Sequence, residues 1–243
     1  MGSYRIFRAL GIDVYVHWTW IIVAAFQMQS VGERYHRPVW GVWEVLFLFG
    51  IVLLHEYGHA LAARSIGGRA EKIVLWPLGG IAFVQVPPRP GAVLWSIAAG
   101  PLVNVALLPV TIYLAAAAGV DFGSVRQSYD LREFLFAVAF INAAMLFFNM
   151  LPIYPLDGGQ ILQALLWFVL GRARSLTIAA SIGLVCAAAG GLLALATLPR
   201  HGNYMLLLIA VFAAFQSWQG LKIARALALR DNVTVIDPRE RTV

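Results

Sequence analysis

The stretch from Gly41 to Ile66 reads GVWEVLFLFGIVLLHEYGHALAARSI, and it decides the fold class. Its apolar run exceeds the roughly 20 residues that an α-helix needs to cross a bilayer. Three ionisable residues, His55, Glu56 and His59, nevertheless lie within five positions inside it. Because ionisable groups are costly inside a membrane span, they mark a functional site by default.

The rest of the chain is similarly apolar. Of its 243 residues, 60% are hydrophobic and 12% are charged, and the mean hydropathy is +0.77. Soluble domains carry about 25% charged residues, so this composition excludes a soluble globule and a disordered chain. The single Cys186 excludes an intramolecular disulfide framework. The net charge of +6 is explained by basic cytoplasmic loops rather than by nucleic-acid binding.

We therefore predict an all-α polytopic membrane protein with about six transmembrane helices. The apolar runs that predict them are residues 12–30, 41–66, 91–119, 133–151, 175–198 and 203–224. The fourth span is predicted to be broken, because a Pro- and Gly-rich interruption separates it from the apolar stretch Gln160 to Leu170. We expect residues 1–225 to form one transmembrane domain and residues 226–243 to form a short polar cytoplasmic tail.

A short β-hairpin is predicted between the second and third spans. Residues 73–75 and 81–84 are typical of strands, and Pro77 with Gly79-Gly80 is typical of the turn between them. An exposed edge of this membrane-associated hairpin would pair with an extended peptide. The alternative is a simple re-entrant or surface hairpin.

The distribution of basic residues predicts the orientation. Thirteen of the 18 Lys and Arg residues fall on one side of the six predicted spans, and five fall on the other, namely Arg34, Arg37, Arg126, Arg132 and Arg200. Cytoplasmic loops carry the excess of Lys and Arg. Both termini are therefore predicted to be cytoplasmic.

The spacing of the three ionisable residues in the second span predicts a metal site. Positions i and i+4 share one helix face, so both imidazoles of His55 and His59 can reach one metal ion. Glu56 lies about 100° round the helix from His55, close enough to hold a water molecule rather than the metal. This is the His-Glu-x-x-His zinc pattern, with two ligands and a general base.

A catalytic zinc ion takes a third protein ligand. The strong candidate is Asp157, which follows the interruption after the fourth span, where Pro152 and Pro155 remove backbone donors and Gly158-Gly159 is expected to break the helix further. His17 in the first span is the alternative ligand. The two remaining histidines fall in the predicted outer loops, at His36 and His201.

These motifs together resemble the site-2 protease family of intramembrane zinc metalloproteases. The resemblance rests on His55-Glu-Tyr-Gly-His59 and on Asn149-x-x-Pro-x-x-Pro-Leu-Asp-Gly-Gly159, together with the strings Trp76-Pro-Leu-Gly-Gly80 and Gly100-Pro-Leu-Val-Asn104. It covers roughly residues 10–225. The chain is most similar to the compact six-span branch, because the sequence has no insertion long enough for a PDZ domain and no CBS pair.

The resemblance implies one zinc ion per chain held by His55, His59 and Asp157, with Glu56 as the catalytic base. It implies that Asn149 helps to hold the substrate strand or its developing oxyanion; an interhelical hydrogen bond is the alternative. The implied activity is regulated intramembrane proteolysis of a transmembrane protein substrate. The implied location is the lipid bilayer of a bacterial or archaeal cell membrane.

Two other function classes remain open from the residues alone. A transporter also places His and carboxylate residues in its spans, although it more often shows repeats with matched broken helices. A catalytically silent relative would bind transmembrane helices without cutting them, and the intact Glu56 argues against it.

Overall fold

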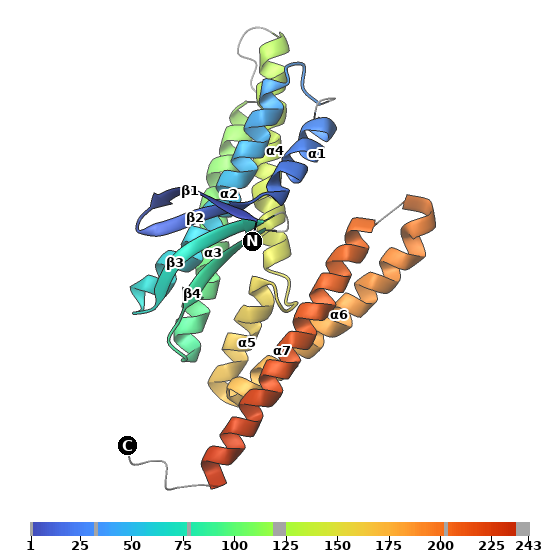
Figure 1. Cartoon of the computed structure of the whole chain (residues 1–243). Helices are drawn as coiled ribbons and strands as arrows, with labels where there is room; N and C mark the ends of the chain where they lie inside the picture. The colour runs from blue at the N-terminus through green and yellow to red at the C-terminus, as the bar shows by residue number, and fades with distance from the viewer. Residues whose placement is uncertain (1, 32–33, 77–78, 119–124, 202–203, 237–243) are drawn as a thin grey trace. The chain divides into compact units, whose positions relative to one another are not determined.

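The structure is a computed structural model, and it describes residues 2–31, 34–76, 79–118, 125–201 and 204–236 (Figure 1). The chain divides into two compact units, Met1–Phe148 and Asn149–Val243. The first unit contains a small sheet and the helices before the interruption. The second unit contains the interruption and the helices after it.

Most residues of the first unit's helices are apolar. These helices are α1 (Thr19–Val31), α2 (Val39–Ser65), α3 (Pro90–Ala117) and α4 (Val125–Asn149). Large apolar side chains cover their outer faces, for example Tyr113 on α3 and Phe140 on α4, which are 71% and 73% exposed. A helix that is hydrophobic all round belongs in a core or in a membrane, and these outer faces are suited to lipid.

A four-stranded sheet packs against α2. Its strands are β1 (Ser3–Ala9), β2 (Ile12–His17), β3 (Arg69–Trp76) and β4 (Gly79–Gln85), in that spatial order. The β2–β3 pair is parallel, and the two outer pairs are antiparallel. Ile12, Val14, Ile73 and Leu75 are completely buried in the core beneath the sheet. The predicted hairpin is therefore confirmed as β3–β4, although Pro77 at its turn lies outside the described residues.

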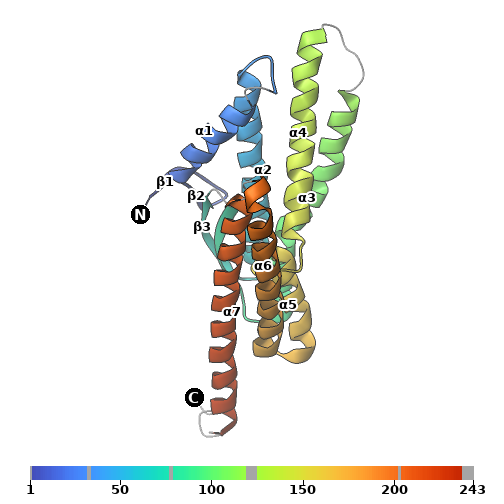
Figure 2. The same cartoon turned by 90° about the vertical axis from the view of Figure 1, so that its right-hand side faces the viewer.

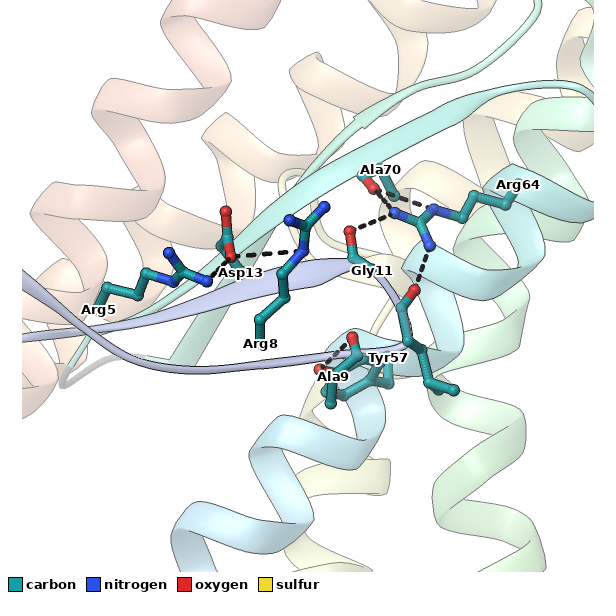
Figure 3. A network of polar contacts seen from close by, with 9 residues as sticks. Arg5, Arg8, Ala9, Gly11, Asp13, Tyr57, Arg64 and Ala70 are labelled. Carbon is teal, nitrogen blue, oxygen red and sulfur yellow. Dashed lines mark hydrogen bonds and ion pairs between the residues drawn. The ribbon is translucent and has the colours of Figure 1, made fainter.

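Arg64 on α2 fixes this sheet to the helix (Figure 3). Its guanidinium group donates to the backbone carbonyls of Leu10 and Gly11 at the β1–β2 turn and to that of Ala70 on β3. Within the β1–β2 hairpin, Asp13 on β2 forms a 2.9 Å ion pair with Arg5 on β1. Polar contacts therefore join both hairpins to the end of α2.

The second unit contains α5 (Asp157–Leu170), α6 (Arg172–His201) and α7 (Tyr204–Ile236). Helices α6 and α7 run side by side in both views (Figures 1 and 2). Residues 150–156 form a non-helical segment before α5, as the interruption in the sequence predicts. Helix α7 continues through Ile236 into the predicted tail, and residues 237–243 lie outside the described part of the chain.

Gly158-Gly159 does not break the helix, so that expectation is wrong. Both glycines lie in the first turn of α5. A Cβ atom at Gly158 would lie 2.5 Å from the carbonyl oxygen of Leu151, and one at Gly159 would meet the backbone of Ile153 and Tyr154. The two glycines instead let the non-helical segment pack directly against the start of α5.

Five helices among the described residues are long and apolar enough to cross a bilayer, at Val39–Ser65, Pro90–Ala117, Tyr129–Asn149, Arg172–Leu198 and Leu206–Arg230. The predicted span at 12–30 is wrong as a single helix, because its first part is β2 and α1 has 13 residues. A helix of that length measures about 20 Å, whereas the hydrocarbon core is about 30 Å thick. The chain is an integral membrane protein, and its mostly helical fold with a small β-sheet and a broken fourth span agrees with the predicted fold class apart from the sixth helix.

Candidate metal centre

Two histidines lie close together near the C-terminal end of α2. His55 and His59 lie one turn apart on α2, and both are buried, with exposed fractions of 2% and 7%. Their Nε2 atoms are 3.0 Å apart. The i, i+4 spacing in the sequence therefore does bring both imidazoles to one point, as predicted.

Each imidazole has a hydrogen-bond acceptor behind it. The Nδ1 atom of His59 lies 2.9 Å from the backbone carbonyl oxygen of Ser96, and the Nδ1 atom of His55 lies 2.6 Å from Oδ1 of Asn104. Both acceptors belong to α3. With a proton on each Nδ1 atom, the Nε2 lone pairs of both rings face one another.

This donor set fits a metal ion. Two imidazole lone pairs facing each other at 3.0 Å repel unless a cation or a proton lies between them. Two nitrogen ligands at 2.0–2.1 Å in tetrahedral geometry are about 3.3 Å apart, close to the observed separation. A second layer of acceptors on the Nδ1 atoms is also typical of histidines that bind metals.

Gly100 allows α3 to approach the histidine pair. A Cβ atom at this position would lie 2.8 Å from Nε2 of His55 and still closer to the ring of His59. Any larger residue would push α3 away from α2 and would carry Asn104 and Ser96 with it. The small residue is therefore part of what holds the acceptors in place.

The carboxylate of Glu56 lies against β4. Its Oε2 atom accepts a 2.9 Å hydrogen bond from the backbone N–H of Ala82, and the side chain is 6% exposed. A Cβ atom at Gly80 would lie 2.5 Å from Cδ of Glu56. The β4 strand therefore packs directly on this carboxylate, and only glycine at position 80 leaves it room.

The other predicted residues lie in the second unit or at its start. Asp157 is the first residue of α5 and is buried. The extended conformation of Leu156, with φ −61° and ψ 160°, turns the chain into that helix. Asn149 is the last residue of α4, where the non-helical segment begins.

The remaining histidines have other surroundings. His17 ends β2, where its Nδ1 atom lies 2.6 Å from Oγ1 of Thr19 and its ring lies against Trp18 and Trp76. The Nδ1 atom of His36, in the segment before α2, lies 3.0 Å from a carboxylate oxygen of Asp130. The side chain of His201 is outside the described part of the structure.

Sequence reasoning missed Asn142 on α4, which is fully buried and contacts Asn104. It also missed the role of Ala82, which acts through its backbone. An amide inside an apolar span is the signal that could have pointed to Asn142, since buried amides in membranes form interhelical hydrogen bonds.

The comparisons with known proteins agree with these motifs. The model of peptidase family M50 matches residues 43–127 and 109–190, more than half of the chain. A zinc metalloprotease of Methanocaldococcus jannaschii is 31% identical over 242 residues, which are 97% of this chain and 65% of that protein. Stage IV sporulation protein FB of Bacillus subtilis is 35% identical over 120 residues, which are 49% of this chain and 38% of that protein.

A solved structure also resembles the fold. The site-2 protease from Methanocaldococcus jannaschii matches with a TM-score of 0.59 and 29% identity, over 90% of this chain and 95% of that one. The chain spans less than two thirds of the length of the two curated relatives named above. The family match and the similarity of fold confirm the resemblance drawn from the motifs, and the chain belongs to peptidase family M50.

Proposed function

We propose that this chain is an intramembrane zinc metalloprotease that hydrolyses a peptide bond in or near a transmembrane segment of a membrane-protein substrate. The observation that carries the proposal is the buried pair of His55 and His59, with Glu56 beside them, inside a helix long enough to cross the bilayer. The zinc metalloprotease relative and the site-2 protease fold support it. Residues 1–225 would act as one metalloprotease domain.

His55, His59 and Asp157 are the proposed ligands of one zinc ion. Two imidazoles and one carboxylate form a usual catalytic zinc set with an open position. Zinc supplies Lewis acidity, which polarises a carbonyl group and lowers the pKa of water towards neutrality. The support for Asp157 is its residue type, its position after the broken span, and the match of its motif to the family.

Glu56 is the proposed general base. Its carboxylate takes a proton from the attacking water and passes it to the leaving amine. The N–H of Ala82 holds one carboxylate oxygen, so β4 orients the base. Asn149 is the proposed contact for the substrate strand or its developing oxyanion.

The free edge of β4 is the proposed docking site for an unwound substrate. Strand β4 lies at one edge of the sheet, and the N–H of Ala82 points towards Glu56 and not towards β3. Because backbone groups alternate along a strand, the N–H of Val84 points to the same free edge, and that of Phe83 points to β3. A peptide paired at this edge would lie beside the general base.

Replacing Val84 by Pro tests the docking edge. Proline removes one outward donor and is tolerated at an edge position whose N–H makes no ladder bond. We expect kcat/KM to fall about tenfold relative to the matched control Val84→Ala, as one hydrogen bond of the docked strand is lost. Equal cleavage by the two variants would contradict strand docking. Ala82→Pro and Phe83→Pro are less informative, because they also disrupt the bond to Glu56 or the β3–β4 ladder.

We also propose that both termini face the cytoplasm of a bacterial or archaeal cell. Strand β2 pairs with β3, which follows the C-terminal end of α2, and α1 leads from β2 back towards the N-terminal end of α2. Residues 12–31 therefore run opposite to α2 as a strand and a short helix, so the N-terminal strands lie on the side of the β3–β4 hairpin. The excess of Lys and Arg on the side of the β3–β4 hairpin supports this orientation.

A library of apolar transmembrane peptides in detergent tests the proposed activity. We expect the zinc-loaded wild-type protein to cleave a subset of the peptides, and Glu56→Gln or a chelator to abolish cleavage. Mass spectrometry of the products gives the cut sites. Cleavage by Glu56→Gln at the wild-type rate would contradict the proposal.

A further inference from the structure

Two asparagines form a buried chain of hydrogen bonds behind His55. Asn104 on α3 and Asn142 on α4 are both completely buried. The side-chain amide of Asn104 donates to Oδ1 of Asn142 at 2.8 Å, and that of Asn142 donates to the backbone carbonyl of Asn104 at 3.1 Å. This chain of hydrogen bonds ends at Nδ1 of His55, which lies 2.6 Å from Oδ1 of Asn104.

The backbone carbonyl of Asn104 fixes which group donates and which accepts in each of these hydrogen bonds. A carbonyl oxygen accepts hydrogen bonds and cannot donate, so the NH₂ group of Asn142 must face it. The Oδ1 atom of Asn142 then faces the side chain of Asn104, which must present its own NH₂ group there. The Oδ1 atom of Asn104 is therefore left to face His55 and accepts its Nδ1 proton.

The result selects one tautomer of His55. With the proton on Nδ1, the lone pair of Nε2 is directed towards His59 and can bind a metal. If Asn104 turned by 180°, its NH₂ group would face Nδ1, and the proton would move to Nε2 and prevent ligation. The tautomer of His59 needs no such chain of hydrogen bonds, because the backbone carbonyl of Ser96 accepts from its Nδ1 atom directly.

We propose that Asn104 and Asn142 are positioning residues that hold His55 in its metal-binding tautomer, with Asn142 acting through Asn104. The inference rests on the proposed function, because it assumes that His55 is a zinc ligand. It assigns to α4 a part in the metal site, through the hydrogen bonds that Asn142 makes with Asn104.

Zinc affinity measured by competition with a chromogenic chelator tests the role of Asn142. In Asn142→Leu, Asn104 is free to turn, and we expect the affinity for zinc to fall about 10–100-fold, as on loss of an outer-shell partner. Val138→Ala is the matched control, since Val138 is a buried residue one turn earlier on α4. We expect it to lower stability while leaving the zinc affinity within about threefold of wild type.

Asn104→Asp separates tautomer selection from simple packing. A carboxylate accepts from Nδ1 of His55 in either orientation, so it needs no partner to direct it. We therefore expect Asn142→Leu to have little effect, within about threefold, when it is added to Asn104→Asp. An equal loss of zinc affinity from Asn142→Leu in both backgrounds would overturn the proposal and indicate a packing role.

Nitrogen-15 spectra of labelled histidine give a second readout that does not depend on proteolysis. We expect the zinc-free wild-type protein to show His55 with its proton on Nδ1, and Asn142→Leu to show a mixture of tautomers. An unchanged tautomer in Asn142→Leu would overturn the inference. If the wild-type protein binds no zinc, the proposed function fails; if it binds zinc and the asparagine variants bind it equally well, the inference alone fails.

Discussion

Helix α2 carries two buried groups of ionisable residues, and their partners differ in kind. Near its start, Glu44 is 2% exposed, receives a 2.6 Å hydrogen bond from Tyr35 and lies 3.3 Å from the guanidinium group of Arg34. Near its end, neutral acceptors hold the Nδ1 atoms of His55 and His59.

The difference indicates which group is structural. A buried carboxylate with a cation and a phenol beside it is compensated within the fold. Two imidazole Nε2 atoms 3.0 Å apart, each ring with a neutral acceptor at its Nδ1 atom, are instead arranged as metal ligands are. The type of partner, more than burial itself, therefore distinguishes a site from a structural ion pair.

The largest expected difference in activity is between two exchanges of a carboxylate for an amide, one in each group. Glu56→Gln should lower the rate of peptide hydrolysis by about 10²–10⁴, because it removes the general base. Glu44→Gln should leave the rate within about threefold of wild type, since Glu44 lies at the other end of α2 and pairs with Arg34 and Tyr35. Initial rates with one cleaved peptide check both, and a comparable loss in Glu44→Gln would remove the distinction.

A smaller loss of activity should follow from Gly80→Ala. The added Cβ atom would lie 2.5 Å from Cδ of Glu56, so the carboxylate must move. Because a displacement of about 1 Å can cost about 10²-fold, we expect a loss of that order in kcat with zinc content unchanged. Gly50→Ala is the control in the same helix as Glu56, with nothing within 4 Å of the added atom. Full activity in Gly80→Ala would show that β4 does not position the base.

Removing the phenol beside Glu44 should affect stability and not catalysis. Tyr35→Phe leaves the buried carboxylate without its 2.6 Å hydrogen bond from the phenol. We expect the free energy of unfolding to fall by about 1–3 kcal/mol, with zinc content and hydrolysis unchanged. Chemical unfolding in detergent measures this, beside the exposed control Tyr113→Phe. A loss of zinc in Tyr35→Phe would mean that the two groups on α2 are coupled.

The smallest effect is a pH dependence at high pH. Burial and the neighbouring Glu44 raise the pKa of Tyr35 above its ordinary value. The stability that this shift contributes is complete below pH of about 10 and is lost as the pH rises further, because the unfolded chain deprotonates first. The difference in unfolding free energy between wild type and Tyr35→Phe should therefore shrink above that pH. A constant difference would contradict the shift.

The sequence predicted that His55 and His59 lie together because the period of an α-helix fixes their relative positions. His55 and His59 share a face at i, i+4 in any α-helix, so their meeting needed no tertiary information. The β3–β4 hairpin was likewise predictable from a local pattern of strand residues around a turn.

Strand β2 was missed because its residues fit the start of an apolar membrane span equally well. Ile12 and Val14 are buried beneath the sheet, while Asp13 between them pairs with Arg5 on β1. That alternation indicates a strand, but it covers too few residues to be distinguished from the start of a membrane helix. The partners of β2 lie on β1 and on β3, and β3 is distant in the sequence.

Asn142 was missed for a different reason. Its function depends on a backbone carbonyl of another helix, and side-chain spacing carries no trace of such a partner. The same holds for Ala82, whose N–H contacts Glu56 and whose side chain plays no part. Contributions made by the backbone, or to it, become visible only once the helices and strands are packed.

Metal content of the detergent-purified protein, measured by mass spectrometry for wild type beside Asp157→Ala, tests the central claim most directly. The account predicts about one zinc per chain in the wild type and a much lower content in the variant, because a ligand is lost. Absence of zinc from a folded wild-type protein prepared without chelator would contradict the metalloprotease proposal. Full zinc retention by Asp157→Ala would contradict the proposed ligand set and make His17 the next residue to replace.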